Sequence, residues 1–231
     1  MLTLHYFPSN ASMTPHILLE ELGVPFELKL VDRTQGVHKS TEYLKLNPNG
    51  LIPVLVDDDF ATPLVLYETA AICSHLLDKF PEKKLAPAVG TPERAHFYKW
   101  LVWMTNTLQP AIIMYYYTDR YTLAKDPADI FAIKTKTQLR IGDMLRQLDE
   151  QLAQSGGPWM LGERFSALDI YAFMLGRWTR GFESVINGAP NTPKASDTSA
   201  WPRLAPFMHR MLERASVQRV IEKEGLKAPL I

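Results

Sequence analysis

The polar residues best suited to act on a small molecule lie in the first third of the chain. The loop FPSNASMTPHI places three short hydrogen-bond donors, Ser9, Asn10 and Ser12, between an apolar strand candidate and a helix candidate. Tyr6 is a longer donor at the end of that strand. A donor aimed at sulfur, or a helix N-terminus beside it, stabilises a thiolate. The alternative is that these residues only form turns, for which Ser and Asn are suited.

A second polar pair, Glu68 and Thr69, stands where the apolar stretch LVLY meets the helical pattern ETAAICSHLLDKF. The free N–H groups and the dipole at a helix N-terminus favour a bound anion. The pair therefore indicates either an anion site or a simple helix cap.

Pro53 begins the apolar stretch PVLVD within NPNGLIPVLVD. A proline cannot donate a hydrogen bond to a sheet, but it is tolerated at the start of a strand, and most X-Pro bonds are trans. A cis Ile52–Pro53 bond would instead leave neighbouring backbone groups facing outward. An extended peptide could pair with those groups as a strand does.

The elements that would position these residues follow a β-α-β-α-β-β-α order in about 80 residues. Strands are predicted over 2–7 and 26–32. The helix between them is predicted to start with Thr14 as N-cap and to end at Gly23. A hairpin is predicted over 53–68, and a helix follows it. This order predicts an open α/β sheet.

The rest of the chain is predicted to be helical. Residues 1–82 form the predicted α/β domain, 83–91 a linker rich in proline, and 92–231 an all-helical domain. The polar, proline-containing stretch 187–202 predicts a mobile loop in the second domain.

Composition narrows the function classes. The chain has 231 residues and a formal net charge of +0, which argues against a nucleic-acid partner. The sequence contains no apolar run of the ~20 residues that a membrane span requires. The first residues contain no secretory signal pattern, so a cytoplasmic protein is predicted. No residues have metal-ligand spacing, so no metal is predicted.

Cys73 is the only cysteine, so an internal disulfide is impossible. It falls on the apolar face of a predicted helix and is interpreted as a small buried hydrophobe. Asp169, in the pattern Ser166-x-x-Asp169, is interpreted as a structural helix cap.

Four stretches together resemble the cytosolic glutathione transferase superfamily, in particular its bacterial beta- and nu-like members. They are NPNGLIPVL, LYETAAICSHL, FSALDIYAF and the C-terminal WPRLAPFMHRMLERASVQRVIEKEGL. The resemblance implies an α/β thioredoxin-like N-terminal domain plus an all-α C-terminal domain. It also implies glutathione as co-substrate, an electrophile site in the helical domain, a homodimer and a cis bond before Pro53.

The resemblance implies that six residues bind glutathione, namely Lys39, Ile52, Pro53, Glu68, Thr69 and His38. Thr69 would hold the γ-glutamyl carboxylate, and Glu68 would meet the amine. The Ile52 backbone would pair with the cysteinyl residue. His38 and Lys39 would lie near the glycyl carboxylate.

The sequence departs from the beta class at functional positions. Ala11 replaces the class cysteine, so a mixed disulfide at that position is excluded. Leu51 cannot donate a side-chain hydrogen bond to the glycyl carboxylate. Gln109 and Pro110 stand where the class has a His-Lys pair.

The thiol of glutathione, with a pKa near ~8.5, needs a stabilising group to ionise at neutral pH. Ser12 is the preferred candidate, because it lies just before the predicted N-cap, and Asn10 and Ser9 follow. The apolar wall for the electrophile is predicted from Tyr6, Phe7, Trp103, Met104, Thr107, Met114, Tyr115 and Tyr121.

The implied function is conjugation of the glutathione thiolate to a small hydrophobic electrophile. The alternatives are a glutathione-dependent disulfide reductase or peroxidase that uses no protein cysteine, and a non-catalytic glutathione-binding protein.

Overall fold

The computed structural model describes residues 1–182, 185–186, 189–190 and 197–231. The chain divides into two compact units. The first unit joins Met1–Ala86 to Glu213–Lys227, and the second joins Pro87–Leu212 to Ala228–Ile231. This division differs from the predicted one, because residues 213–227 pack with the first unit. Half of the predicted loop 187–202, namely 187–188 and 191–196, lies outside the described residues.

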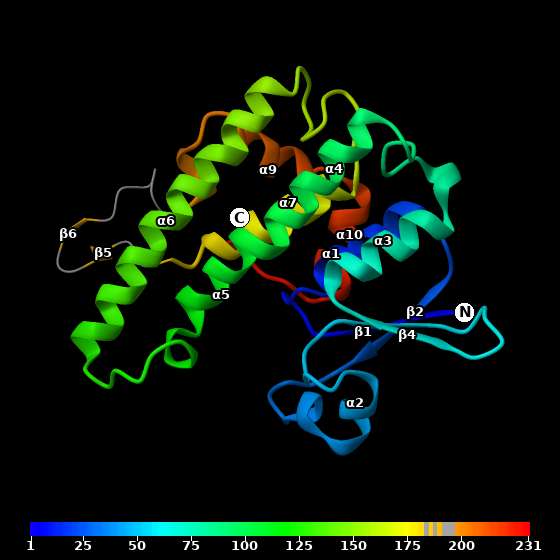
Figure 1. Cartoon of the computed structure of the whole chain (residues 1–231), viewed down its shortest axis with the longest axis horizontal. Coiled ribbons are helices and arrows are strands. Elements are labelled where there is room, and N and C mark those ends of the chain that lie inside the picture. The colour runs from blue at the N-terminus through cyan, green and yellow to red at the C-terminus, as the bar shows by residue number, and fades with distance from the viewer. Residues whose placement is uncertain (183–184, 187–188, 191–196) are drawn as a thin grey trace. The chain divides into compact units, whose positions relative to one another are not determined.

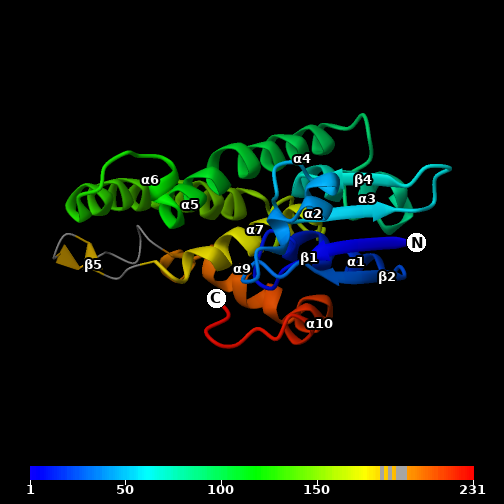
Figure 2. The same ribbon diagram turned by 90° about the horizontal axis from the view of Figure 1, so that it is seen from below.

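The first unit is built on a four-stranded sheet in the order β2-β1-β3-β4. Its strands are β1 (Leu2–Tyr6), β2 (Phe26–Leu30), β3 (Val54–Asp57) and β4 (Leu64–Tyr67). β1 runs parallel to β2 and antiparallel to β3, and β3 pairs with β4 as the predicted hairpin. Figure 2 shows β1, β2 and β4 within this sheet.

Helices cover both faces of this sheet. They are α1 (Met13–Leu22), α2 (Thr41–Leu46), α3 (Thr69–Lys79) and α10 (Ala215–Lys223). α1 and α3 lie on one face and α2 on the other (Figure 1). α10, from the end of the chain, packs along α1. The arrangement confirms the predicted α/β thioredoxin-like N-terminal fold.

The predicted start of α1 is wrong by two residues. Ser12, not Thr14, is the N-cap, and the helix begins at Met13. Met13 and Thr14 are both fully buried, so the side of the helix that packs on the core includes its first residues. Pro15 is tolerated there because the first turn has N–H groups without intrahelical partners. The predicted C-cap, Gly23, is left-handed, with φ +64°, and its N–H bonds the carbonyl of Leu19.

The second unit is helical, as predicted. Its main helices are α4 (Pro92–Trp103), α5 (Gln109–Tyr116), α6 (Pro127–Gln154), α7 (Ala167–Thr179) and α9 (Leu204–Leu212). A π-helical segment, Met104–Leu108, joins α4 to α5. Pro110 follows this segment and has no N–H, and its ring would clash with the carbonyl four residues earlier. A local widening of the helix is the expected response.

Two short strands, β5 (Val185–Ile186) and β6 (Ala189–Pro190), pair in the second unit. The predicted cap of α7 is present as a capping box. Asp169 accepts from Ser166 N–H at 2.8 Å and from Met160 N–H at 2.8 Å. Within the part of the chain that the structure describes, every helix is too short or too polar to span a lipid bilayer.

Candidate functional site

The strand register brings three sequence-distant segments to one end of the sheet. His5 of β1 pairs with Val54 of β3, and Val54 pairs with Tyr67 of β4. Each of these strands therefore meets a candidate segment at the same end of the sheet. These segments are the Phe7–Ser12 loop, the Ile52–Pro53 bond and the Glu68–Thr69 pair. The first unit alone assembles these candidates.

Ser12, the preferred thiol-stabilising candidate, has a fully buried side chain. Its hydroxyl donates to the carbonyl of Phe7 at 3.1 Å and accepts from the N–H of Phe7 at 3.3 Å. The hydroxyl proton is therefore already used within the loop. This geometry gives Ser12 the role of closing the loop and argues against its direct contact with a ligand.

Asn10 and Ser9 are both partly exposed. The Asn10 side-chain oxygen accepts from the N–H of Ala11 at 2.6 Å. An amide group so oriented keeps its nitrogen for another acceptor. Ser9 has a left-handed backbone, with φ +60°. Ala11 is buried, so the position of the beta-class cysteine carries no reactive group.

Glu68 and Thr69 form the junction between β4 and α3. Glu68 is exposed and is the N-cap residue, with φ +72°, and Thr69 is the buried first residue of the helix. The first N–H groups of α3 therefore have no intrahelical partners, and the exposed acidic residue Glu68 directly precedes them. This pairing suits a ligand that carries a carboxylate and an amine on one carbon.

The Ile52–Pro53 peptide bond is cis. The preceding turn is fixed through the carbonyl of Leu51, which accepts from Asn47 Nδ2 at 2.8 Å and from the Tyr43 hydroxyl at 2.9 Å. Sequence reasoning did not single out Asn47 or Tyr43. The Asn-Pro-Asn-Gly pattern was a signal for Asn47, because asparagine side chains commonly bond backbone groups in turns.

Lys39 and His38 lie in a short 3-10 helix, Val37–Lys39. Lys39 is exposed, and its Nζ donates to the carbonyl of Asn49 at 3.1 Å. This bond places the ammonium group next to the turn that leads to Pro53. Gly50 in that turn has φ +58°.

Two further residues at the loop, His16 and Glu224, were missed. Glu224 follows α10, and both side chains are fully buried. Glu224 Oε1 lies 2.9 Å from His16 Nδ1, and Oε2 accepts from the N–H of Ser9 at 2.8 Å. The pairing joins positions 208 residues apart, so local sequence patterns gave no signal for it.

The predicted apolar wall is only partly exposed. Met104 and Tyr115 are buried, and the Tyr115 ring packs 4.3 Å from that of Phe182. Those two assignments are therefore corrected, because core side chains do not line a ligand surface. Thr107 and Met114 are half-buried, and Tyr121 is exposed.

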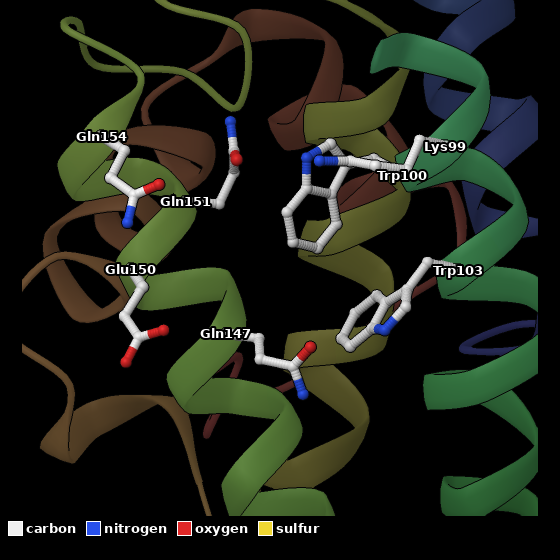
Figure 3. A pocket seen from close by; sticks show the side chains of 7 residues that line it. All are labelled: Lys99, Trp100, Trp103, Gln147, Glu150, Gln151 and Gln154. Carbon is white, nitrogen blue, oxygen red and sulfur yellow. The ribbon is translucent and has the colours of Figure 1, made fainter. Parts of the chain in front are cut away.

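Trp103 lines a groove of about 310 Å³ between α4 and α6 in the second unit (Figure 3). The two indoles of Trp100 and Trp103 meet edge to face at 5.2 Å. The opposite wall is polar and consists of Gln147, Glu150, Gln151 and Gln154.

Cys73 is buried, and burial raises the pKa of its thiol, which makes the thiolate scarce. Among the described residues, no three side chains of the metal-binding types come together.

Comparison with known proteins identifies related chains. Residues 8–79 match the family model "Glutathione S-transferase, N-terminal domain", and residues 105–224 match "Glutathione S-transferase, C-terminal domain". Glutathione S-transferase GstB of Escherichia coli K12 is 38% identical, with 89% of each chain covered. Disulfide-bond oxidoreductase YfcG of the same organism is 29% identical, over 78% of this chain and 81% of that protein.

A solved structure gives the same picture in three dimensions. It is a glutathione transferase homologue from Sulfitobacter with bound glutathione, and its TM-score to this chain is 0.80. The two chains are 26% identical, with 96% of this chain and 98% of the other covered.

Proposed function

Because the chain belongs to the glutathione S-transferase superfamily, we propose that it binds glutathione and conjugates the thiolate to a small hydrophobic electrophile. The observation that carries the proposal is the strand register. It brings the donor loop, the Ile52–Pro53 bond and the Glu68–Thr69 pair to one end of the sheet.

Glutathione would lie extended across this end of the sheet. The Thr69 hydroxyl and the first N–H groups of α3 would hold the γ-glutamyl carboxylate, and Glu68 would pair with the amine. The backbone of Ile52, before Pro53, would pair with the cysteinyl residue. Lys39, with His38 beside it, would supply charge near the glycyl carboxylate.

The sulfur would face the Phe7–Ser12 loop at the start of α1. Asn10 and Ser9 are the partly exposed donors there, and Ser12 supports the loop from inside. The thiol loses its proton to solvent, and the helix dipole and the donors stabilise the thiolate. The thiolate attacks the electrophilic carbon, and the leaving group departs without a covalent enzyme intermediate.

Two single substitutions test binding and activation separately. Glu68→Ala should raise the Kd for glutathione by about tenfold or more, because a charge-assisted pair is lost. Asn10→Ala should keep the affinity but raise the pKa of the bound thiol by about one unit. Glutathione titration and the pH dependence of conjugation measure the two effects. Glu82→Ala, which removes an exposed carboxylate elsewhere, is the control.

Unchanged glutathione binding in Glu68→Ala would refute the proposed amine contact. Equal pH profiles for the parent and for Asn10→Ala would remove Asn10 from thiolate stabilisation. The matching Ser12→Ala and Ser9→Ala variants then decide among the remaining candidates.

A second candidate function is glutathione-dependent disulfide reduction. Ala11 and the buried Cys73 leave glutathione as the thiol that attacks, and one relative is named as a disulfide-bond oxidoreductase. A first glutathione thiolate would attack the substrate disulfide, form a mixed disulfide and expel one substrate thiolate. A second glutathione thiolate would attack the mixed disulfide, form oxidised glutathione and expel the other substrate thiolate. Parallel assays with an aryl halide, hydroxyethyl disulfide and cumene hydroperoxide rank the reactions. Glutathione binding without turnover would favour the non-catalytic alternative.

The same family membership supports a homodimer in the cytoplasm as part of this proposal. Light scattering across a concentration series tests the dimer, and a mass equal to one chain would contradict it.

A further inference from the structure

Glu224 has a buried carboxylate that connects the end of α10 to the Phe7–Ser12 loop. Its side chain is 0% exposed, as is that of His16. One oxygen meets His16 Nδ1 at 2.9 Å, and the other accepts the N–H of Ser9 at 2.8 Å. A buried carboxylate is costly unless both oxygens are satisfied, and here each oxygen has a partner.

The rest of the α1–α10 contact is held by other residues. Glu21 pairs with Arg214 at 2.7 Å, and Glu20 pairs with Arg219 at 2.5 Å and with Lys223 at 2.6 Å. These ion pairs lie toward the C-terminal end of α1, away from the loop. Glu224 therefore adds a contact to the loop that docking of α10 on α1 does not itself require.

The contact between His16 and Glu224 involves one ring nitrogen and leaves the other without a partner in the part of the chain that the structure describes. An ionised carboxylate only accepts hydrogen bonds, so His16 Nδ1 must carry a proton. His16 Nε2 is buried and has no hydrogen-bond partner among the described residues. A bare ring nitrogen is tolerated there more readily than an unsatisfied N–H group.

The bond from Glu224 holds a residue of the loop whose backbone conformation is unfavourable. Ser9 has φ +60°, a left-handed conformation that costs a non-glycine residue about 1 kcal/mol. Fixing its N–H fixes the peptide plane between Pro8 and Ser9, from which the left-handed backbone of Ser9 leads into Asn10. The direction of the Asn10 side chain depends on that plane.

We infer that Glu224 is a positioning residue that holds the Ser9–Asn10 segment in the orientation required to stabilise the thiolate. The inference rests on the proposed function of this loop. A structural cap would stabilise the fold without affecting the thiol, whereas a positioning residue controls both the order of the loop and the ionisation of bound glutathione.

Three substitutions of Glu224 and one control separate the two roles. Glu224→Gln keeps the shape and the bond to the loop: its carbonyl can accept from Ser9, and its amide can donate to Nδ1 of the alternative tautomer of His16, at the cost of an unsatisfied N–H at Nε2. Glu224→Ala removes both bonds, and Glu224→Asp keeps the charge but withdraws it by one methylene. Glu20→Gln weakens the same helix pair without reaching the loop.

Hydrogen exchange of residues 7–12 is measured first, without glutathione. We expect faster exchange in Glu224→Ala and Glu224→Asp, and parent-like exchange in Glu224→Gln and Glu20→Gln. The pH profile of conjugation should then shift to higher pH in Glu224→Ala and Glu224→Asp. Their rate near neutral pH should fall by about 10- to 100-fold, as misplacement of a catalytic group does.

Parent-like exchange and pH profiles in both Glu224→Ala and Glu224→Asp would overturn the inference. If Glu224→Ala does not fold, the loop exchange and the pH profiles of Glu224→Asp and Glu224→Gln still test the inference. A parent protein that binds glutathione without lowering the pKa of its thiol would overturn the proposed function instead. Hydrogen exchange of residues 7–12 would then still show whether Glu224 orders this loop.

Discussion

At the scale of single residues, the site depends on backbone conformations that few side chains permit. Gly50 has φ +58°, and a Cβ there would lie 2.7 Å from Lys39 Nζ and 2.8 Å from the carbonyl of His38. The glycine therefore allows the lysine to fold over the turn that precedes Pro53. The absence of a side chain at Gly50 leaves room for the Lys39 ammonium group.

Gly50→Ala should lower glutathione affinity by about fivefold, because Lys39 must move away from the new methyl group. Gly36→Ala is a matched control: its φ is +70°, and nothing lies within 4 Å of the added Cβ. Both changes carry the same left-handed backbone cost, but only Gly50→Ala crowds Lys39 and the backbone carbonyl of His38. Titration with glutathione compares them. Equal affinities would show that Lys39 does not take part in binding.

At the scale of elements, the cap of α7 is the contact most open to a direct stability test. Asp169 accepts hydrogen bonds from Met160 N–H, Ser166 N–H and the Ser166 hydroxyl, all of them buried. Asp169→Ala should lower the free energy of unfolding by about 3 kcal/mol, because those donors lose their acceptor. Urea unfolding measures the change, with the exposed Glu163→Ala as control. A loss no larger than that of the control would contradict the structural role.

Local signals predicted the elements better than their long-range contacts. The Gly23 cap, the β3–β4 hairpin and the Ser166–Asp169 box all depend on residues close in sequence, and all are present. The start of α1 was misplaced because Ser12 and Thr14 are both acceptable N-caps, and burial of Met13 decides between them.

The candidate site was predicted where it follows local motifs and missed where it does not. The positions of Pro53 and Glu68 follow from short patterns, and strand pairing brings them together. The burial of Ser12 and the Glu224–Ser9 bond depend on how the loop packs and on a helix from the far end of the chain. Hydrophobic periodicity carries no information about such a pairing.

At the scale of the whole molecule, a buried histidine makes the fold sensitive to acid. His5 lies in β1 and is 4% exposed. Burial, aided by the positive charge of Lys29, lowers the pKa of His5 from 6.5 to about 4. The unfolded chain therefore binds a proton that the folded chain excludes. Its contribution to stability is complete above about pH 6.5 and is lost as the pH falls toward 4.

Between about pH 7.5 and 5.5, this one group should remove about 1 kcal/mol from the free energy of unfolding. His5→Gln should reduce that loss, whereas the exposed His96→Gln should not. Urea unfolding at both pH values provides the comparison. The same acid sensitivity in the His5→Gln variant as in the parent would assign the effect to other groups.

The first unit consists of two stretches that are separated by the whole of Pro87–Leu212. A nascent chain that has reached residue 212 has made every strand of the sheet, but it still lacks the helix that docks on α1. Completion of the first unit therefore waits for synthesis of the last segment. For the same reason, a protein truncated after residue 86 would present the acidic flank of α1, Glu20 and Glu21, to water without its basic partners.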